Sequence, residues 1–135
     1  IVINAGYDHG IRKDMPVVTA AGLVGHIAQV GDSDSVVQLL MRSRVSALVQ
    51  STRVQGIVSW LDGQRFRLRF VEASSFVREG DRVVSSGLGG RYPKGIPIGT
   101  VVEVSQVKRD LVFQQVFIES NVDFPNLEEV FVIVK

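Results

Sequence analysis

The chain has 135 residues, of which 45% are hydrophobic and 21% charged, and its formal net charge is +1. This length accommodates one domain or two very small ones, and so weak a charge bias demands neither nucleic acid nor an anionic membrane as a partner. The absence of cysteine excludes disulfides, thiolate metal sites and a cysteine nucleophile. The longest apolar run, at 130–134, is far shorter than the ~20 residues of a membrane span. Because the chain begins at Ile1 and not at a methionine, we expect a piece of a longer protein.

Apolar residues recur with a period of two along most of the chain, which is typical of β-strands. Turn-forming sequences such as GYDHG, GDSDS and EGD separate these segments at intervals of about 8–12 residues, a rhythm that favours an all-β barrel or sandwich. Only a turn or so near 123–129 has a helical pattern. In chain order, the expected strands lie at 2–5, 16–19, 23–30, 36–40, 44–50, 55–61, 65–70, 81–87, 98–104, 113–119 and 128–134.

The segment RFRLRF at 65–70 alternates strictly between cationic and apolar residues. The Asp62-Gly63 pair just before it is a strong signal for a tight hairpin with the preceding strand. Side chains of a strand point alternately to two faces. We therefore expect one face to carry Phe66, Leu68 and Phe70 and the other to carry Arg65, Arg67 and Arg69.

A weak internal repeat divides the chain into two similar halves. IRKDMPVVT at 11–19 aligns with VREGDRVVS at 77–85, and LVGHIAQV at 23–30 aligns with PIGTVVEV at 97–104. The offset grows from 66 to 74 residues between these two pairs, so the second copy has a loop eight residues longer. We predict two similar small β-barrels, at 1–72 and 73–135.

The enlarged loop lies within GLGGRYPKGIPIGTV at 87–101. It does not match a phosphate-binding loop, which ends in Gly-Lys-Ser/Thr, because Lys94 here precedes Gly95 and is followed by no Ser or Thr at the required place. It does not match the dinucleotide-binding pattern either, because Tyr92 stands where the third glycine is required. We expect its glycines to set the backbone of a barrel corner; they are Gly87, Gly89, Gly90 and Gly99. Its apolar residues either pack on their own barrel or form an exposed anchor for a partner; they are Tyr92, Pro93, Ile96 and Pro97.

No arrangement of residues favours catalysis. The GDS sequence at 31–33 would need His9 or His26 as a base, and Asp34 beside Ser33 would oppose a negatively charged intermediate. No second histidine lies at ligand spacing from His9. We therefore expect no enzyme activity, no metal and no cofactor.

RNA binding by a small β-barrel is the alternative function. VVTAAGLVGHIAQVGD at 17–32 has the strand–glycine–strand pattern of a KOW-type motif, and the arginines of 65–70 follow Trp60 closely. Acidic residues are spread throughout, however, and an alternating arginine strand is usually a solvated sheet face.

Essentially the whole chain resembles the family of rod shape-determining MreC proteins. REGDRVVSSGLGGRYPKGIPIGTVVEV at 78–104 is similar to that family's GD-V-TSGLGG-FP-GIPIG-V signature. GIRKDMPVVTAAGLVGHIAQVG at 10–31 and VVQLLMRSRVSALVQSTRVQGIVSW at 36–60 match two further stretches of the family. The departures are small: Met41-Arg42 replaces an acidic residue or threonine, and Tyr92 replaces a frequent phenylalanine.

The resemblance implies two six-stranded β-barrel-like subdomains packed together, distantly similar to the chymotrypsin fold but without its catalytic groups. It implies a non-catalytic scaffold of the bacterial elongation machinery, which binds and activates the elongation-specific class B penicillin-binding protein and maintains rod shape. MreD and RodA are implied in the same complex, as is self-association into a homodimer or filament, and no nucleic acid is expected. The domain would lie on the periplasmic (extracytoplasmic) face of the inner membrane, anchored by an N-terminal transmembrane helix outside this chain.

Overall fold

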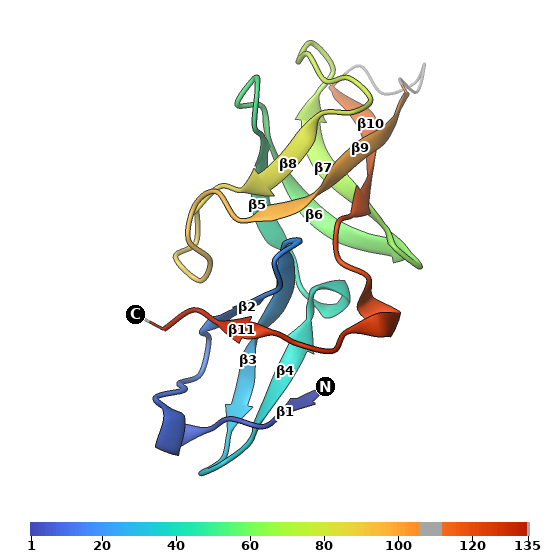
Figure 1. Ribbon diagram of the computed structural model, residues 1–135. Helices are drawn as coiled ribbons and strands as arrows, with labels where there is room; N and C mark the ends of the chain where they lie inside the picture. The colour runs from blue at the N-terminus through green and yellow to red at the C-terminus, as the bar shows by residue number, and fades with distance from the viewer. Residues whose placement is uncertain (106–111, 135) are drawn as a thin grey trace.

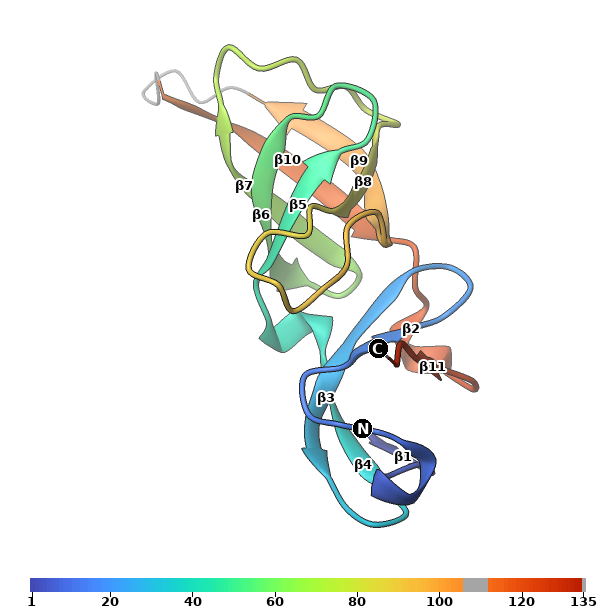
Figure 2. The same cartoon turned by 90° about the vertical axis from the view of Figure 1, so that its left-hand side faces the viewer.

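The computed structural model describes residues 1–105 and 112–134, and within them the chain is all-β, as expected (Figure 1). A closed barrel occupies one end of the molecule and an open, curled sheet the other (Figures 1 and 2). Short 3-10 turns are the only helical segments in these residues: η1 (Tyr7–His9), η2 (Leu40–Arg42) and η3 (Phe124–Asn126).

The open sheet contains five antiparallel strands in the order β1-β4-β3-β2-β11. They are β1 (Val2–Ile3), β2 (Pro16–Val18), β3 (Leu23–Val30), β4 (Ser35–Leu39) and β11 (Phe131–Val132). The two edge strands, β1 and β11, are two residues long and do not pair with each other. The first subdomain is therefore a half-barrel of five strands, and the prediction of six strands in this part is corrected.

The barrel has six antiparallel strands and closes in the order β10-β7-β6-β5-β8-β9. They are β5 (Val45–Val49), β6 (Gln55–Asp62), β7 (Arg65–Glu72), β8 (Arg82–Ser85), β9 (Pro97–Ser105) and β10 (Phe113–Ser120). The predicted hairpin at Asp62-Gly63 joins β6 to β7, and Gly63 has a φ of +47° there.

The sheets do not divide the chain at residue 72. Strand β7 ends at Glu72 and β8 begins at Arg82, yet both belong to the same barrel. The hairpins β5–β6–β7 alone would leave two bare edges, and β8 covers one of them while β10 covers the other. The chain enters the barrel after η2 and leaves it after β10, and the C-terminal β11 pairs with β2 of the open sheet.

The internal repeat is present in the strand register. Val17 lies opposite Gly25 in the β2–β3 pair, and Val83 lies opposite Gly99 in the β8–β9 pair. In both pairs the glycine is needed for space, because a Cβ on Gly25 would collide with the Gln38 carbonyl and a Cβ on Gly99 with that of Glu119. The two copies therefore share the close approach of a third strand, β4 in one and β10 in the other.

The expected alternation of β7 is interrupted at Phe70. Phe66 and Leu68 are fully buried in the barrel, but Phe70 is 49% exposed. A β-bulge causes the change: Leu68 pairs with Val116 and Val71 with Gln114, so β7 has two residues where β10 has one. Phe70 adopts a φ of +63°, a conformation that costs a non-glycine residue about 1 kcal/mol or more.

One continuous apolar cluster connects the two sheets. Val17, Leu23 and Ile27 contribute to it from the open sheet and Phe66 from the barrel, all fully buried. Phe124 of η3 joins the same cluster, with its ring centroid 6.5 Å from that of Phe66. Burial of this shared apolar surface holds the half-barrel against the closed barrel.

The close approach at Gly25 leads to a stability prediction. Gly25→Ala should lower the free energy of unfolding by about 2 kcal/mol, because the added methyl meets a rigid backbone carbonyl. Urea unfolding followed by circular dichroism measures the loss. The control is Gly80→Ala, where φ is +90° but nothing lies within 4 Å of the new Cβ, so only the backbone cost of about 1 kcal/mol applies. Equal losses in the two variants would contradict the steric explanation.

Candidate functional site

The loop between β8 and β9, residues 86–96, lies at the end of the barrel that faces the open sheet (Figure 2). Buried Ser85 anchors it at both ends. The Ser85 hydroxyl donates to the Pro93 carbonyl at 2.5 Å and accepts from the Ile96 amide at 2.9 Å. The Ser85 main chain adds hydrogen bonds with Ile96 (2.9 Å) and Gly95 (2.8 Å). The loop therefore has a defined shape set by one small buried side chain.

The loop glycines have two separate roles. Gly87, Gly89 and Gly90 have φ values of +82°, +86° and +76°, which residues with a Cβ rarely adopt. Gly99 lies in β9 without a positive φ and is needed for the close strand approach described above. The first three glycines therefore serve the turn between β8 and β9, and Gly99 serves strand packing.

The four apolar residues of the loop differ in exposure. Tyr92 is 7% exposed, Pro93 and Ile96 are half-buried, and Pro97 is exposed. Tyr92 reaches the open sheet, where its hydroxyl lies 2.9 Å from Nδ1 of buried His26 on β3. The two rings meet edge to face, with centroids 6.1 Å apart. Tyr92 thus forms an internal contact between the two subdomains.

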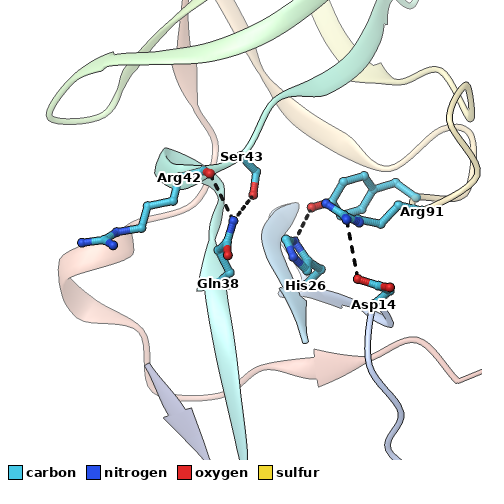
Figure 3. Close-up of polar contacts among 7 residues, drawn as sticks. Asp14, His26, Gln38, Arg42, Ser43 and Arg91 are labelled. Atoms are coloured by element: carbon cyan, nitrogen blue, oxygen red, sulfur yellow. Dashed lines mark hydrogen bonds and ion pairs between the residues drawn. The ribbon is translucent and has the colours of Figure 1, made fainter. Parts of the chain in front are cut away.

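We call the contact region between the loop 86–96 and the open sheet the seam. Polar contacts surround the pair of His26 and Tyr92 there. Arg91 of the loop lies 3.6 Å from the Asp14 carboxylate, and Figure 3 shows both beside His26. Both side chains of this ion pair are about half exposed, so it contributes at most about 1 kcal/mol. On the other side, the Gln38 amide donates to the Arg42 carbonyl at 3.1 Å and to the Ser43 hydroxyl at 3.3 Å (Figure 3).

The seam keeps both ring groups uncharged at neutral pH. Burial lowers the pKa of His26, and the nearby Arg91 guanidinium lowers it further, while Asp14 opposes them. Burial raises the pKa of Tyr92, partly offset by the neighbouring Ser43 hydroxyl and by Arg91. A neutral imidazole and a neutral phenol form a stable buried pair, whereas a proton on His26 would be poorly solvated.

The histidines that the GDS hypothesis required are engaged elsewhere. His9 accepts a hydrogen bond from the Gly6 amide at 3.1 Å, and His26 is paired with Tyr92. Among residues 1–105 and 112–134, no group of three or more His, Cys, Asp or Glu side chains is arranged to hold a metal ion. The same residues contain no helix long and apolar enough to cross a bilayer.

The sequence alone identifies neither the hydrogen-bond partner of His26 nor the role of Ser85. The signal for His26 was its position in the apolar strand LVGHIAQV, where a buried histidine needs a polar partner. No local pattern pointed to Tyr92 as that partner, since the two residues are 66 positions apart.

A model of the family described as "Rod shape-determining protein MreC, barrel core" matches residues 1–134. The chain belongs to the MreC family. The cell shape-determining protein MreC of Listeria monocytogenes is 34% identical over 98% of this chain, and the match spans 47% of that protein. The chain thus spans less than half the length of this relative. The relatives are named for cell shape and not for a reaction, which supports the expectation of a non-enzymatic domain.

Solved structures of MreC proteins have the same fold. MreC from Pseudomonas aeruginosa matches with a TM-score of 0.92 and 29% identity, covering 98% of this chain and 87% of that one. A structure described as a complex between Penicillin-Binding Protein (PBP2) and MreC from Helicobacter pylori matches with a TM-score of 0.67, covering 87% of this chain and 74% of that one. At 20% identity, the latter likeness shows the shared fold alone.

The buried histidine of the seam leads to a pH prediction. The unfolded state takes up a proton at His26 below about pH 6.5, whereas the folded state resists it, so acidification should favour unfolding. Between about pH 7.5 and about pH 5.5, the wild-type chain should lose more stability than His26→Gln in urea unfolding.

His9→Gln is the matched control, because it removes the other histidine of the chain and leaves the pair of His26 and Tyr92 intact. If His26→Gln and the wild type lost stability in parallel over this pH range, the buried pair would not be the acid-sensitive element.

Proposed function

We propose that this domain is a non-catalytic scaffold of bacterial cell elongation that binds the elongation-specific class B penicillin-binding protein. The observation that carries the proposal is the match to the MreC barrel core over residues 1–134. The described complex of an MreC protein with a penicillin-binding protein from Helicobacter pylori supports this class of partner.

Activation of the transpeptidase would follow from preferential binding to its active conformation. A difference in affinity of about 1–3 kcal/mol between two conformations changes activity roughly 5- to 150-fold. A small interface is sufficient for such a difference. The scaffold then needs a surface of defined shape, and the hydrogen bonds of Ser85 to the loop 86–96 support this loop as the candidate.

We base the remaining members of the proposed complex on the resemblance to the MreC family. MreD and RodA would belong to the same complex, and copies of the parent protein would self-associate as a homodimer or filament. The domain would act on the extracytoplasmic side of the inner membrane, tethered by a transmembrane helix outside this chain.

We propose that the transpeptidase contact lies on residues 86–97 and uses the exposed residues of this segment, because Tyr92 is buried in the contact with His26. Leu88 is 60% exposed and Pro97 is also exposed, whereas Ile96 is half-buried against the core. Leu88 lies between Gly87 and Gly89, both of positive φ, and its amide donates to the Ser86 hydroxyl at 3.2 Å. An exposed leucine on a surface turn suits insertion into an apolar pocket of a partner.

Biolayer interferometry of this chain against the soluble ectodomain of the class B transpeptidase tests the proposal. Saturable binding is expected, and Leu88→Glu should weaken it about tenfold because a carboxylate replaces an apolar anchor. A transpeptidation assay with and without the chain measures activation in the same preparation.

Phe76→Glu is the matched control, since Phe76 is 59% exposed but lies on the separate β7–β8 connection. Loss of binding in both variants would show that the effect is general charge repulsion. Binding unchanged by Leu88→Glu would refute the loop contact, and absence of wild-type binding between folded proteins would refute the partner.

A further inference from the structure

The outer surface of β7 and β10 carries a cluster of cationic and aromatic side chains. We call it the arginine–phenylalanine face; its residues are Arg67, Arg69, Phe70, Phe113 and Phe117. The cross-strand pair Phe117↔Arg67 places both side chains on this face. The loop 86–96 lies at the barrel end facing the open sheet, whereas β7 ends and β10 begins at the other end (Figure 1).

The two central arginines of the face lack an ion-pair partner among residues 1–105 and 112–134. Arg65, next to the face, lies 3.3 Å from the Glu103 carboxylate. Arg67 and Arg69 are exposed, and their guanidinium groups lie over aromatic rings, at 5.7 Å from the centroid of Phe117 and 5.1 Å from that of Phe70. Stacking fixes the position of a guanidinium while leaving its N–H donors available at the edge.

The Phe70 side chain points to solvent although phenylalanine is usually buried, and its backbone adopts a conformation that is unfavourable for a non-glycine residue. The bulge turns its ring away from the core that buries Phe66 and Leu68, and the backbone adopts a left-handed conformation to do so. Its ring meets that of Phe113 edge to face at 5.6 Å. Bulges and left-handed backbone at non-glycine residues are frequent where a side chain is aimed at a ligand.

Between these side chains lies a cleft of about 180 Å³. Sites for small molecules and cofactors usually measure about 300–1,000 Å³, so this cleft is too small for them. It is large enough for one apolar side chain. The cleft therefore fits an anchor residue of a larger molecule, with the two arginine edges beside it.

We propose that the arginine–phenylalanine face docks an acidic segment of a protein partner, which inserts a leucine or aromatic side chain into the cleft and places carboxylates on Arg67 and Arg69. Carboxylates match the planar guanidinium edge by paired hydrogen bonds. This docking is independent of the transpeptidase contact on the loop 86–97.

The charges around the face favour a short segment over a polyanion. Glu72 pairs across the strands with Phe113, Glu119 with Arg65 and Glu103 with Phe117, so carboxylates border the face along β7, β10 and β9. A nucleic acid or an anionic bilayer would have to lie over these carboxylates as well as over the arginines. A short peptide that alternates charged and apolar residues contacts only the arginines and the cleft at the centre of the face, and does not lie over the bordering carboxylates.

NMR titration of the chain with a short peptide that alternates glutamate with leucine and phenylalanine tests the proposal. Resonances of 65–71 and 113–117 should shift, and the glutamine analogue of the peptide should not shift them. Phe70→Gly should weaken binding about tenfold. Because glycine accepts the φ of +63°, this variant should keep its fold, which circular dichroism checks. The double variant Arg67→Gln, Arg69→Gln should show a similar loss.

The controls are Arg53→Gly, another exposed non-glycine residue with positive φ (+65°), and Arg82→Gln, an exposed arginine on β8. Both should bind the peptide as the wild type does. No shifts, shifts outside the face, or equal losses in the controls would overturn the proposal. It would also be overturned if phosphatidylglycerol vesicles or polyuridylate RNA shifted these resonances at lower concentration than the peptide.

Discussion

The backbone pairing of β5 with β8, in which Ala47 lies opposite Ser85 and Val49 opposite Val83, closes the six-stranded barrel. It joins the β5–β6–β7 meander to the β8–β9–β10 meander, and each would otherwise expose an unpaired edge. Ser85 is therefore held in the barrel wall by its neighbours on both sides. Because this residue also anchors the loop 86–96, barrel closure decides where that loop lies.

The loop in turn connects the barrel to the half-barrel. Tyr92 covers His26, and the shared apolar cluster continues beneath them from one sheet to the other. A buried aromatic pair with a hydrogen bond is directional in a way that apolar packing alone is not. The seam therefore restricts the relative orientation of the subdomains, which a scaffold needs if its surfaces are to keep a constant spacing.

The two surfaces that we propose as partner contacts differ in chemistry. The loop 86–97 exposes Leu88 on a glycine-rich turn, while the arginine–phenylalanine face combines guanidinium groups stacked on phenylalanine rings with a cleft for one side chain. The loop connects β8 to β9, whereas the face lies on strands β7 and β10. The two proposed contacts therefore use separate elements of the barrel.

The sequence by itself determined the all-β class, the hairpin at Asp62-Gly63, the internal repeat of 11–30 in 77–104, and the family. These features depend on local periodicity, turn chemistry and motif, which are properties of neighbouring residues. Only the tertiary structure decided that β7 and β8 share one barrel, that Phe70 turns outward at a bulge, and that Tyr92 pairs with His26. These features depend on which distant strands meet and in which register, and an alternating pattern constrains neither.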